Sequence, residues 1–190
     1  PIYIGFGSML SDDTDNLTSL IYEAIAQSGR RAIIATGWGG LKASADNNPD
    51  ILVIDAAPHD WLFPKLSLAV HHGGAGTTAA TVRAGIPSVV IPFFGDQPFW
   101  AWRLEQNGVA PKMLKRKTLT AEKLADAINM ASTPNMQIAA TELAEKISNE
   151  NGVQSAIALL AQWGLLTPPD INDVPVLNDD AAYPKTATTV

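Results

Sequence analysis

Short runs of consecutive apolar residues recur along the chain and alternate with longer stretches of helical period. The apolar runs lie at residues 2–6, 32–36, 51–54, 67–70, 88–91 and, more weakly, 110–113. Because these runs are apolar at successive positions, they are typical of parallel strands that are covered on both faces. The stretches between and after them predict helices at residues 15–28, 77–84, 97–107, 121–130, 135–148 and 153–163. This alternation predicts an α/β fold, a doubly wound parallel six-stranded sheet with helices on both faces.

The length of 190 residues is enough for one domain with a hydrophobic core. The periodic pattern ends near Leu165, and the remainder is rich in Pro, Asp, Asn and Thr. We therefore expect a ligand-binding domain at residues 1–164 and a tail at residues 165–190 that is mobile or docks on another part of the protein. The first residues enter a strand directly, so we expect the chain to be cut from a longer protein.

Composition and charge exclude several classes of function. The chain carries 19 acidic and 13 basic residues, a formal net charge of −6. A mildly acidic chain without a basic cluster lacks the electrostatic footprint of a nucleic-acid-binding protein, and it offers no polybasic stretch for an anionic membrane. The absence of cysteine excludes disulfides and thiolate metal sites. No apolar run approaches the roughly 20 residues of a membrane span. We expect a cytoplasmic protein with no transmembrane segment, whose membrane contacts, if any, lie outside this sequence.

Five consecutive predicted strands are each followed by a loop of Gly, His, Ser, Thr, Trp or Asp. These loops occupy residues 5–8, 37–40, 57–61, 71–78 and 92–97. Doubly wound sheets bind ligands in the crevice outside the carboxyl ends of their strands. The sequence therefore predicts a ligand site along this edge of the sheet.

The most specific loop is the fourth, which reads His-His-Gly-Gly-Ala-Gly-Thr-Thr at residues 71–78. Its glycines let backbone N–H groups approach a ligand, and the following helix adds unpaired donors and a partial positive charge. His72 and the hydroxyl of Thr77 would stand beside the same anion. The simpler alternative is a glycine-rich turn with Thr77 as helix N-cap. That alternative does not explain why all three histidines fall between residues 59 and 72.

The same loop also satisfies a dinucleotide-binding pattern. Gly74, Gly76 and Ala79 match G-x-G-x-x-A, and Asp96 lies about twenty residues further on. The position argues against this interpretation, because the pattern belongs after the first strand of its unit and the acid should end the next strand. An NAD-dependent oxidoreductase domain remains an alternative function.

A carboxylate and a carboxamide follow the fifth strand at Asp96 and Gln97. Together they can both donate to and accept from sugar hydroxyls, although Asp96 is equally suited to be a helix N-cap. Trp38 and Trp61 lie on neighbouring loops, where each would stack on a base or a sugar or else serve as a core aromatic. Ser8, beside two glycines, is a further phosphate donor or part of a plain turn.

The run from residue 58 to residue 97 closely resembles the nucleotide-sugar signature of family 1 glycosyltransferases, enzymes with the two-domain GT-B fold. Within that family it is most similar to the sterol 3-β-glucosyltransferases. The resemblance rests on residues 58–63, 71–78, 83–87 and 92–97 and extends over roughly residues 1–160. It implies that the chain is the Rossmann-like, donor-binding C-terminal half of a GT-B fold.

The resemblance also implies a role for individual residues. Those against the nucleobase would be Ala57, Pro58 and His59; those at the diphosphate would be Ser8, His72, Gly74, Ala75, Gly76 and Thr77; those at the hexose would be Asp96 and Gln97. Two positions depart from the plant members, which have a tryptophan where this chain has Ala56 and a ribose-contacting glutamate where it has Ala80. Trp38 is a candidate for the missing stacking surface.

The activity implied is inverting transfer of a hexose, from UDP-glucose, to the hydroxyl of a sterol or similar lipid. The resemblance implies no metal and no cofactor, since backbone N–H groups, hydroxyls and His72 would stabilise the leaving diphosphate. It places the catalytic base in an N-terminal domain outside this sequence, so no catalytic residue is expected here and the chain alone would be inactive. A non-catalytic nucleotide-sugar sensor is the second alternative.

Overall fold

The computed structural model describes residues 1–9, 14–37, 41 and 48–165. By its internal contacts the chain divides into two units, Pro1–Asn149 and Glu150–Val190. In the second unit the structure describes helix α7 (Gly152–Gln162), which begins where the Asn151 side chain accepts from the Gln154 N–H at 3.2 Å. No residue of α7 is buried. None of the described helices is both long and apolar enough to cross a membrane. The predicted tail at 165–190 lies, except for Leu165, outside the described residues.

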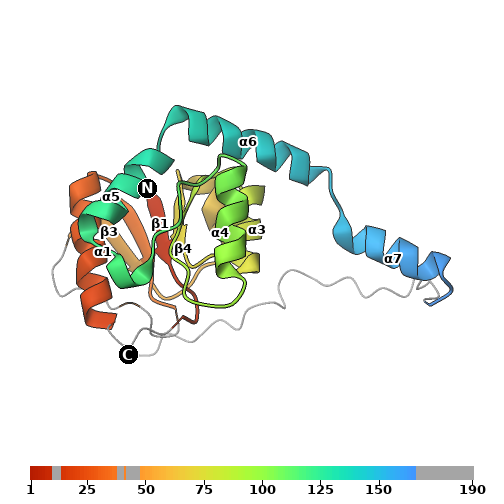
Figure 1. Ribbon diagram of the computed structural model, residues 1–190, viewed down its shortest axis with the longest axis horizontal. Helices are drawn as coiled ribbons and strands as arrows, with labels where there is room; N and C mark the ends of the chain where they lie inside the picture. The colour runs from red at the N-terminus through yellow and green to blue at the C-terminus, as the bar shows by residue number, and fades with distance from the viewer. Residues whose placement is uncertain (10–13, 38–40, 42–47, 166–190) are drawn as a thin grey trace, which may run out of the picture. The chain divides into compact units, whose positions relative to one another are not determined.

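The first unit is built on one parallel sheet, and the predicted α/β fold is confirmed (Figure 1). Its strands are β1 (Ile2–Gly5), β2 (Ala32–Ala35), β3 (Ile51–Ile54), β4 (Ala69–His71) and β5 (Ser88–Val90). They lie in the order β3-β2-β1-β4-β5, so the first strand of the chain is the central strand of the sheet. All four pairings are parallel, as the consecutive apolar runs predict.

The sheet has five strands in the described part of the chain, rather than the six expected. The segment that was to form the sixth does run beside β5, because the Ser88 N–H donates to Val109 O and the Leu114 N–H donates to Val90 O, both at 2.9 Å. Val109 to Leu114 is longer than the stretch of β5 that it accompanies, so its backbone is not extended. Pro111 also lacks the N–H that a ladder needs.

Helices cover both faces of the sheet. On one face lie α1 (Thr14–Ser28) and α5 (Ala121–Ala131), which pack against each other. On the other lie α2 (His59–Leu62), the 3-10 turn η1 (Phe63–Lys65), α3 (Ala75–Arg83) and α4 (Gln97–Gln106), with α6 (Pro134–Ser148) packed on α3. A second 3-10 turn, η2 (Arg116–Thr118), precedes α5.

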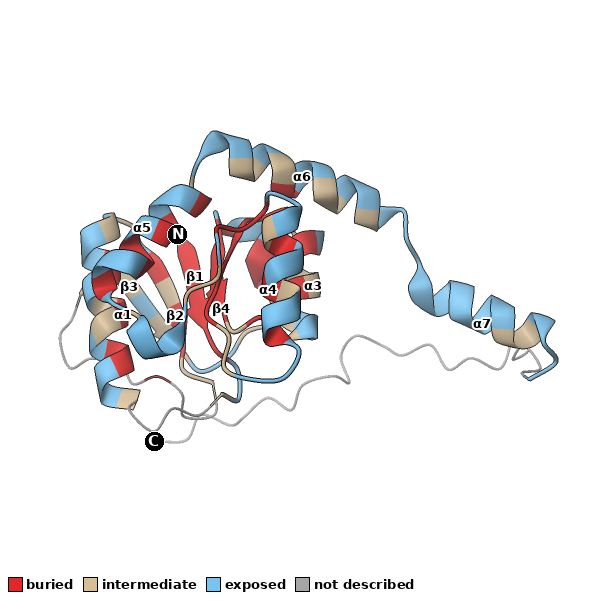
Figure 2. Ribbon diagram, viewed as in Figure 1, coloured by how far each residue is buried: buried red, intermediate tan, exposed pale blue. Residues whose placement is uncertain are grey.

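The two covered faces explain why the strands have apolar residues at successive positions. Along β1, Ile2 and Ile4 are fully buried in the core under α1 and α5. Tyr3, between them, points to the opposite face and packs with Phe63 and Ile86. Successive side chains of a strand alternate between faces, and here both faces are dry. The buried residues accordingly concentrate in the strands and the inner sides of the helices (Figure 2).

The strand order also locates a ligand crevice. From β1 the chain proceeds outward on one side through β2 and β3, then returns to the other side of β1 with β4 and β5. The direction therefore reverses between β1 and β4, where Gly5 pairs with His71. The loops that leave these two strands diverge at their carboxyl ends, which is where doubly wound sheets bind ligands.

Candidate functional site

The imidazole of His72 lies between the two loops at this reversal point. A Cβ added to Gly7, in the loop after β1, would lie 3.5 Å from His72 Cε1. A Cβ added to Gly74, on the other side, would overlap His72 Nε2 and lie 3.1 Å from its Cδ2. Gly74 has an ordinary φ of −62°, so glycine is required there for space and not for conformation. Loops more than sixty residues apart in sequence thus meet around one histidine.

The N-terminus of α3 is open at the same place. Gly74 is its N-cap and makes no side-chain capping bond, and the first bond of the helix runs from the Thr78 N–H to Gly74 O at 2.9 Å. The N–H groups of Ala75, Gly76 and Thr77 therefore have no acceptor within the helix. Beyond its own helix and chain neighbours, no atom of the described residues lies within 4 Å of a Cβ added to Gly76. The helix starts two residues before the predicted Thr77, so Thr77 is not the N-cap.

The surroundings of His72 favour its neutral form. Burial lowers the pKa of His72, the neighbouring His59 lowers it further, and Asp96 raises it. Nδ1 of His72 is buried and has no hydrogen-bond partner among the described residues. A bound anion would favour the protonated imidazole, because an opposite charge nearby stabilises the charged form.

His71 is a structural neighbour of this site. Its side chain is fully buried, and burial together with His72 and His59 lowers its pKa to about 3. Nδ1 accepts from the Gly73 N–H at 3.0 Å, which fixes the turn into α3. Gly73 itself has a φ of +87°, and a Cβ there would lie 2.8 Å from Val90 Cγ1. Of the two adjacent histidines, His71 therefore holds the turn into α3 and His72 faces the carboxyl edge of the sheet.

Gln97 is used within the protein. Only 4% of it is exposed, and its Oε1 accepts from the N–H groups of Phe93 at 2.6 Å and Phe94 at 3.1 Å. Its Nε2 lies 3.5 Å from the sulfur of Met9. The carboxamide therefore holds the loop after β5 against the loop after β1. Its predicted contact with the hexose stays a prediction.

Asp96 is exposed beside this loop. It occupies the N-cap position of α4, yet its side chain makes no capping bond. Instead its Oδ2 accepts from Trp100 Nε1 at 2.7 Å. Asp96 raises the pKa of His72, which means that its carboxylate acts on the same region as the imidazole. An exposed carboxylate beside an anion site is suited to hydroxyls of the same ligand.

A cavity of about 200 Å³ adjoins these groups on the β2 and β3 side. It is lined by Tyr3, Gly7, Ser8, Ala35, Gly37, Asp55, Ala56, Ala57 and His59. Three of the residues predicted to contact a nucleotide, namely Ser8, Ala57 and His59, therefore share one cavity. The His59 ring stacks on Phe63 with centroids 4.4 Å apart, and burial lowers its pKa while Asp60 raises it. Pro58 is the N-cap of α2.

Asp55 is a candidate that the sequence analysis missed. It follows β3 directly, lines this cavity, and accepts from Thr36 Oγ1 at 3.5 Å. Its signal was present in the sequence, since an acidic residue immediately after a strand belongs to the ligand edge of the sheet. A carboxylate there can accept hydrogen bonds from two hydroxyls at once.

Of the two tryptophans proposed for stacking, only Trp61 is described, and it does not line the cavity. Trp38 lies outside the described residues. Trp61 is 61% exposed, and its ring is covered by Lys65 Nζ at 4.0 Å. Within the described residues, no group of three or more His, Asp and Glu side chains is arranged to hold a metal ion.

The sequence matches the family described as the erythromycin biosynthesis protein CIII-like C-terminal domain over residues 23–159. Sterol 3-beta-glucosyltransferase UGT80A2 of Arabidopsis thaliana is 43% identical over 157 residues, which cover 83% of this chain and 25% of that protein. Sterol 3-beta-glucosyltransferase of Candida albicans is 42% identical over 165 residues, which cover 82% of this chain and 11% of that protein. The chain therefore spans a quarter or less of the length of these relatives.

Solved glycosyltransferases share the fold. The glycosyltransferase of kitacinnamycin superposes with a TM-score of 0.72 at 22% identity, over 85% of this chain and 42% of that one. Arabidopsis thaliana UGT89C1, in a structure complexed with UDP-L-rhamnose, gives a TM-score of 0.69 at 21% identity, over 87% of this chain and 43% of that one. In each case the described fold corresponds to less than half of the larger protein.

Proposed function

The chain belongs to the EryCIII-like C-terminal domain family of GT-B glycosyltransferases, and from this premise we propose that it binds UDP-glucose for an inverting transfer of the hexose. Family membership supports the statement that the chain is the donor-binding half of a glycosyltransferase. The identity of the sugar, the lipid acceptor and the inverting course are the further content of the proposal. The acceptor is inferred from the sterol glucosyltransferase names of the relatives.

The observation that carries the proposal is the open N-terminus of α3 with His72 beside it. Three unpaired N–H groups and the positive end of the helix dipole favour an anion with several oxygens, such as a diphosphate. The reversal of strand order between β1 and β4 supports this assignment, because doubly wound sheets bind ligands in the crevice at such a point. No other described helix N-terminus combines unpaired donors, glycine and a histidine.

The neighbouring groups fit the remaining parts of a nucleotide sugar. The base would enter the 200 Å³ cavity against Ala57 and His59, and the ribose hydroxyls would meet Asp55. The hexose would lie on the other side of the diphosphate, toward the exposed Asp96. Ser8 lines the cavity between these positions and would donate its hydroxyl to a phosphate oxygen.

In this arrangement the protein stabilises the leaving group. As the bond from the anomeric carbon to the diphosphate oxygen breaks, negative charge collects on UDP. The α3 N–H groups, the Thr77 hydroxyl and the imidazole of His72 would stabilise that charge without a metal ion. An acceptor hydroxyl would attack the opposite face of the anomeric carbon and give its proton to a base. We expect that base to come from residues outside this sequence.

The experiment that tests the proposal is calorimetric titration with UDP, UDP-glucose and NAD in the presence of EDTA. We expect UDP to bind, UDP-glucose to bind more tightly, and NAD to bind weakly or not at all. His72→Ala should weaken UDP binding by about tenfold to a hundredfold, the range for losing a hydrogen bond to a charged group. Lys146→Ala, an exposed change on α6, is the matched control.

Three outcomes would contradict parts of the proposal. Tighter binding of NAD than of UDP would favour the oxidoreductase alternative. UDP binding that disappears in EDTA would show that a metal ion is required. Binding without any sugar transfer, after the chain is joined to an N-terminal half taken from one of its relatives, would favour the sensor alternative.

A further inference from the structure

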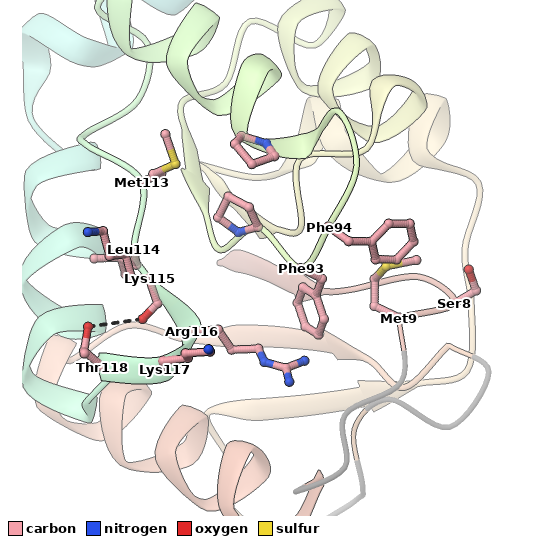
Figure 3. A pocket seen from close by; sticks show the side chains of 12 residues that line it. Ser8, Met9, Phe93, Phe94, Met113, Leu114, Lys115, Arg116, Lys117 and Thr118 are labelled. Atoms are coloured by element: carbon pink, nitrogen blue, oxygen red, sulfur yellow. Dashed lines mark hydrogen bonds between the residues drawn. The ribbon is translucent and has the colours of Figure 1, made fainter.

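A second and larger cavity lies on the other side of Ser8. Its volume is about 960 Å³, within the range of sites for drug-sized ligands. It opens between the loops after β1 and β5 on one side and the segment leading into η2 on the other (Figure 3). Its lining comprises Ser8, Met9, Pro92, Phe93, Phe94, Pro98, Met113, Leu114, Lys115, Arg116, Lys117 and Thr118. Apart from Ser8, none of these residues belongs to the proposed donor site.

The walls of this cavity are apolar. Figure 3 shows Met9, Phe93 and Phe94 on one side and Met113 and Leu114 on the other. Phe94 is 66% exposed, and the other four are partly buried where they pack on the hydrophobic core. Exposed apolar side chains that converge on a concave surface mark a binding site more often than a structural need. The occupant therefore has an apolar body.

One edge of the cavity is basic. Lys115, Arg116 and Lys117 are consecutive and all exposed. The Arg116 guanidinium lies 4.9 Å from the centre of the Phe93 ring, so a cation stands directly on the apolar wall. Among the described residues, none of the three has a carboxylate within ion-pair distance. Three consecutive exposed cations without a partner in the described part of the chain are notable, since the net charge of the sequence is −6.

We propose that this basic-edged groove binds an anionic amphiphile. The apolar chain would lie between Phe93, Phe94 and Met113, and the acidic head group would meet Lys115, Arg116 and Lys117. A neutral lipid would leave the basic edge unpaired, and a small anion without a chain would leave the apolar walls in water. The expectation of no basic cluster is thus wrong for this surface, since the overall negative charge conceals a local basic one.

Two sources supply such a ligand, a free fatty acid in solution and an acidic phospholipid in a bilayer. Both present an acidic head group on an apolar chain, which is the chemistry that the groove recognises. The inference does not depend on UDP binding, because only Ser8 is shared with the donor site. It can therefore hold or fail separately from the proposed function.

The first test is displacement of the fluorescent fatty acid cis-parinaric acid by oleate, by oleyl alcohol and by inorganic phosphate. Oleyl alcohol has the same chain without the charge, and phosphate has the charge without the chain. We expect oleate to displace the probe at concentrations at least about tenfold lower than either. Two results would overturn the proposal. One is equal displacement of the probe by oleate and by oleyl alcohol. The other is failure of the probe to bind, together with no binding of the protein to acidic vesicles.

Variants locate the site. Lys115→Glu with Lys117→Glu should weaken oleate binding by about tenfold or more, since a basic side chain near an anionic surface is worth roughly 1 kcal/mol, about fivefold. Met113→Asp should weaken the binding of both oleate and the fluorescent probe. Lys146→Glu, a single reversal of charge on the exposed face of α6, should leave the binding of both unchanged. Unaltered binding in both groove variants would overturn the assignment, and circular dichroism of the same variants shows whether they are folded.

Vesicles separate the two sources. Co-sedimentation with phosphatidylcholine vesicles, with and without phosphatidylserine, measures attachment to an acidic bilayer. Sedimentation only with the acidic vesicles, lost on reversing Lys115 and Lys117, identifies a phospholipid as the ligand. Oleate binding without sedimentation identifies a free fatty acid.

Discussion

The imidazole of His72 lies against the α-carbon of Gly74 so closely that any side chain at residue 74 would overlap Nε2. Position 74 is also the N-cap of α3, and its φ of −62° is open to every residue. One glycine therefore sets both the start of the helix and the position of the histidine beside it. A substitution at residue 74 should therefore alter the shape of the site without destabilising the fold.

Gly74→Ala should keep the fold and weaken UDP binding. The added Cβ displaces the imidazole from the α3 N-terminus, and we expect a loss of about tenfold, the size of one hydrogen bond to a charged group. Calorimetric titration measures the affinity, and circular dichroism checks the fold. Gly152→Ala is the control, since a Cβ there meets no atom within 4 Å. Unchanged affinity in Gly74→Ala would remove His72 from the site.

Gln97→Leu should destabilise the protein by about 2–4 kcal/mol. The N–H groups of Phe93 and Phe94 lose their acceptor, and each unpaired buried donor costs about 1–3 kcal/mol. Urea unfolding measures the loss. Gln106→Leu, the same change at an exposed position of the same helix, should cost less than about 0.5 kcal/mol. Equal stabilities of the two variants would contradict the structural role of Gln97.

The free energy of unfolding should fall as the pH drops below 6.5. The pKa of His71 is about 3 in the folded chain and 6.5 in its ordinary state, so the unfolded state binds the extra proton first. His71 therefore contributes stability above pH 6.5 that is lost progressively toward pH 3. The slope from this residue is at most about 1.4 kcal/mol per pH unit.

His71→Asn should remove that slope while its side-chain oxygen still accepts from the Gly73 N–H. Urea unfolding between pH 6.5 and 5.5 compares the two proteins before most carboxylates titrate. A variant that is as pH-sensitive as the parent would assign the slope to other groups, with His72 and His59 the next candidates.

Asp55→Ala should weaken the preference for UDP over 2′-deoxy-UDP. If the carboxylate accepts a hydrogen bond from the ribose 2′-hydroxyl, the parent chain binds UDP more tightly than 2′-deoxy-UDP. In the variant the ratio of the two affinities should be about tenfold smaller. Competition titration measures both affinities. Asp126→Ala, an exposed acidic position on α5, controls for the change in net charge. Parallel losses for both nucleotides would show that Asp55 acts without the 2′-hydroxyl.

The sequence was sufficient where local chemistry decides the structure. Consecutive apolar residues such as Ile2, Tyr3 and Ile4 can be buried together only in a strand with two dry faces, so the parallel sheet followed. The prediction of a sixth strand was wrong because β5 bonds only to the two ends of the segment 109–114. The pattern of apolar residues does not show the path that the backbone takes between those ends.

The site was less accessible than the fold. His71 and His72 are identical in type and adjacent, and only their alternate directions at the end of β4 give one to the core and one to the crevice. The start of α3 at Ala75 was missed because glycines ahead of a helix are indistinguishable from a loop. Lys115, Arg116 and Lys117 are consecutive in the sequence, and they were missed because the prediction rested on the net charge of the whole chain.

The central place of β1 has a consequence for how the molecule is made. Strand β1 bonds on one side to β2, through Ile2 and Arg31, and on the other to β4, through Tyr3 and Leu68. The second pairing closes a loop of more than sixty residues, which is an expensive and therefore late event in folding. His72 meets Gly7 in that same event. A nascent or partly unfolded chain therefore lacks the proposed donor site. A nucleotide would stabilise only molecules whose sheet is complete.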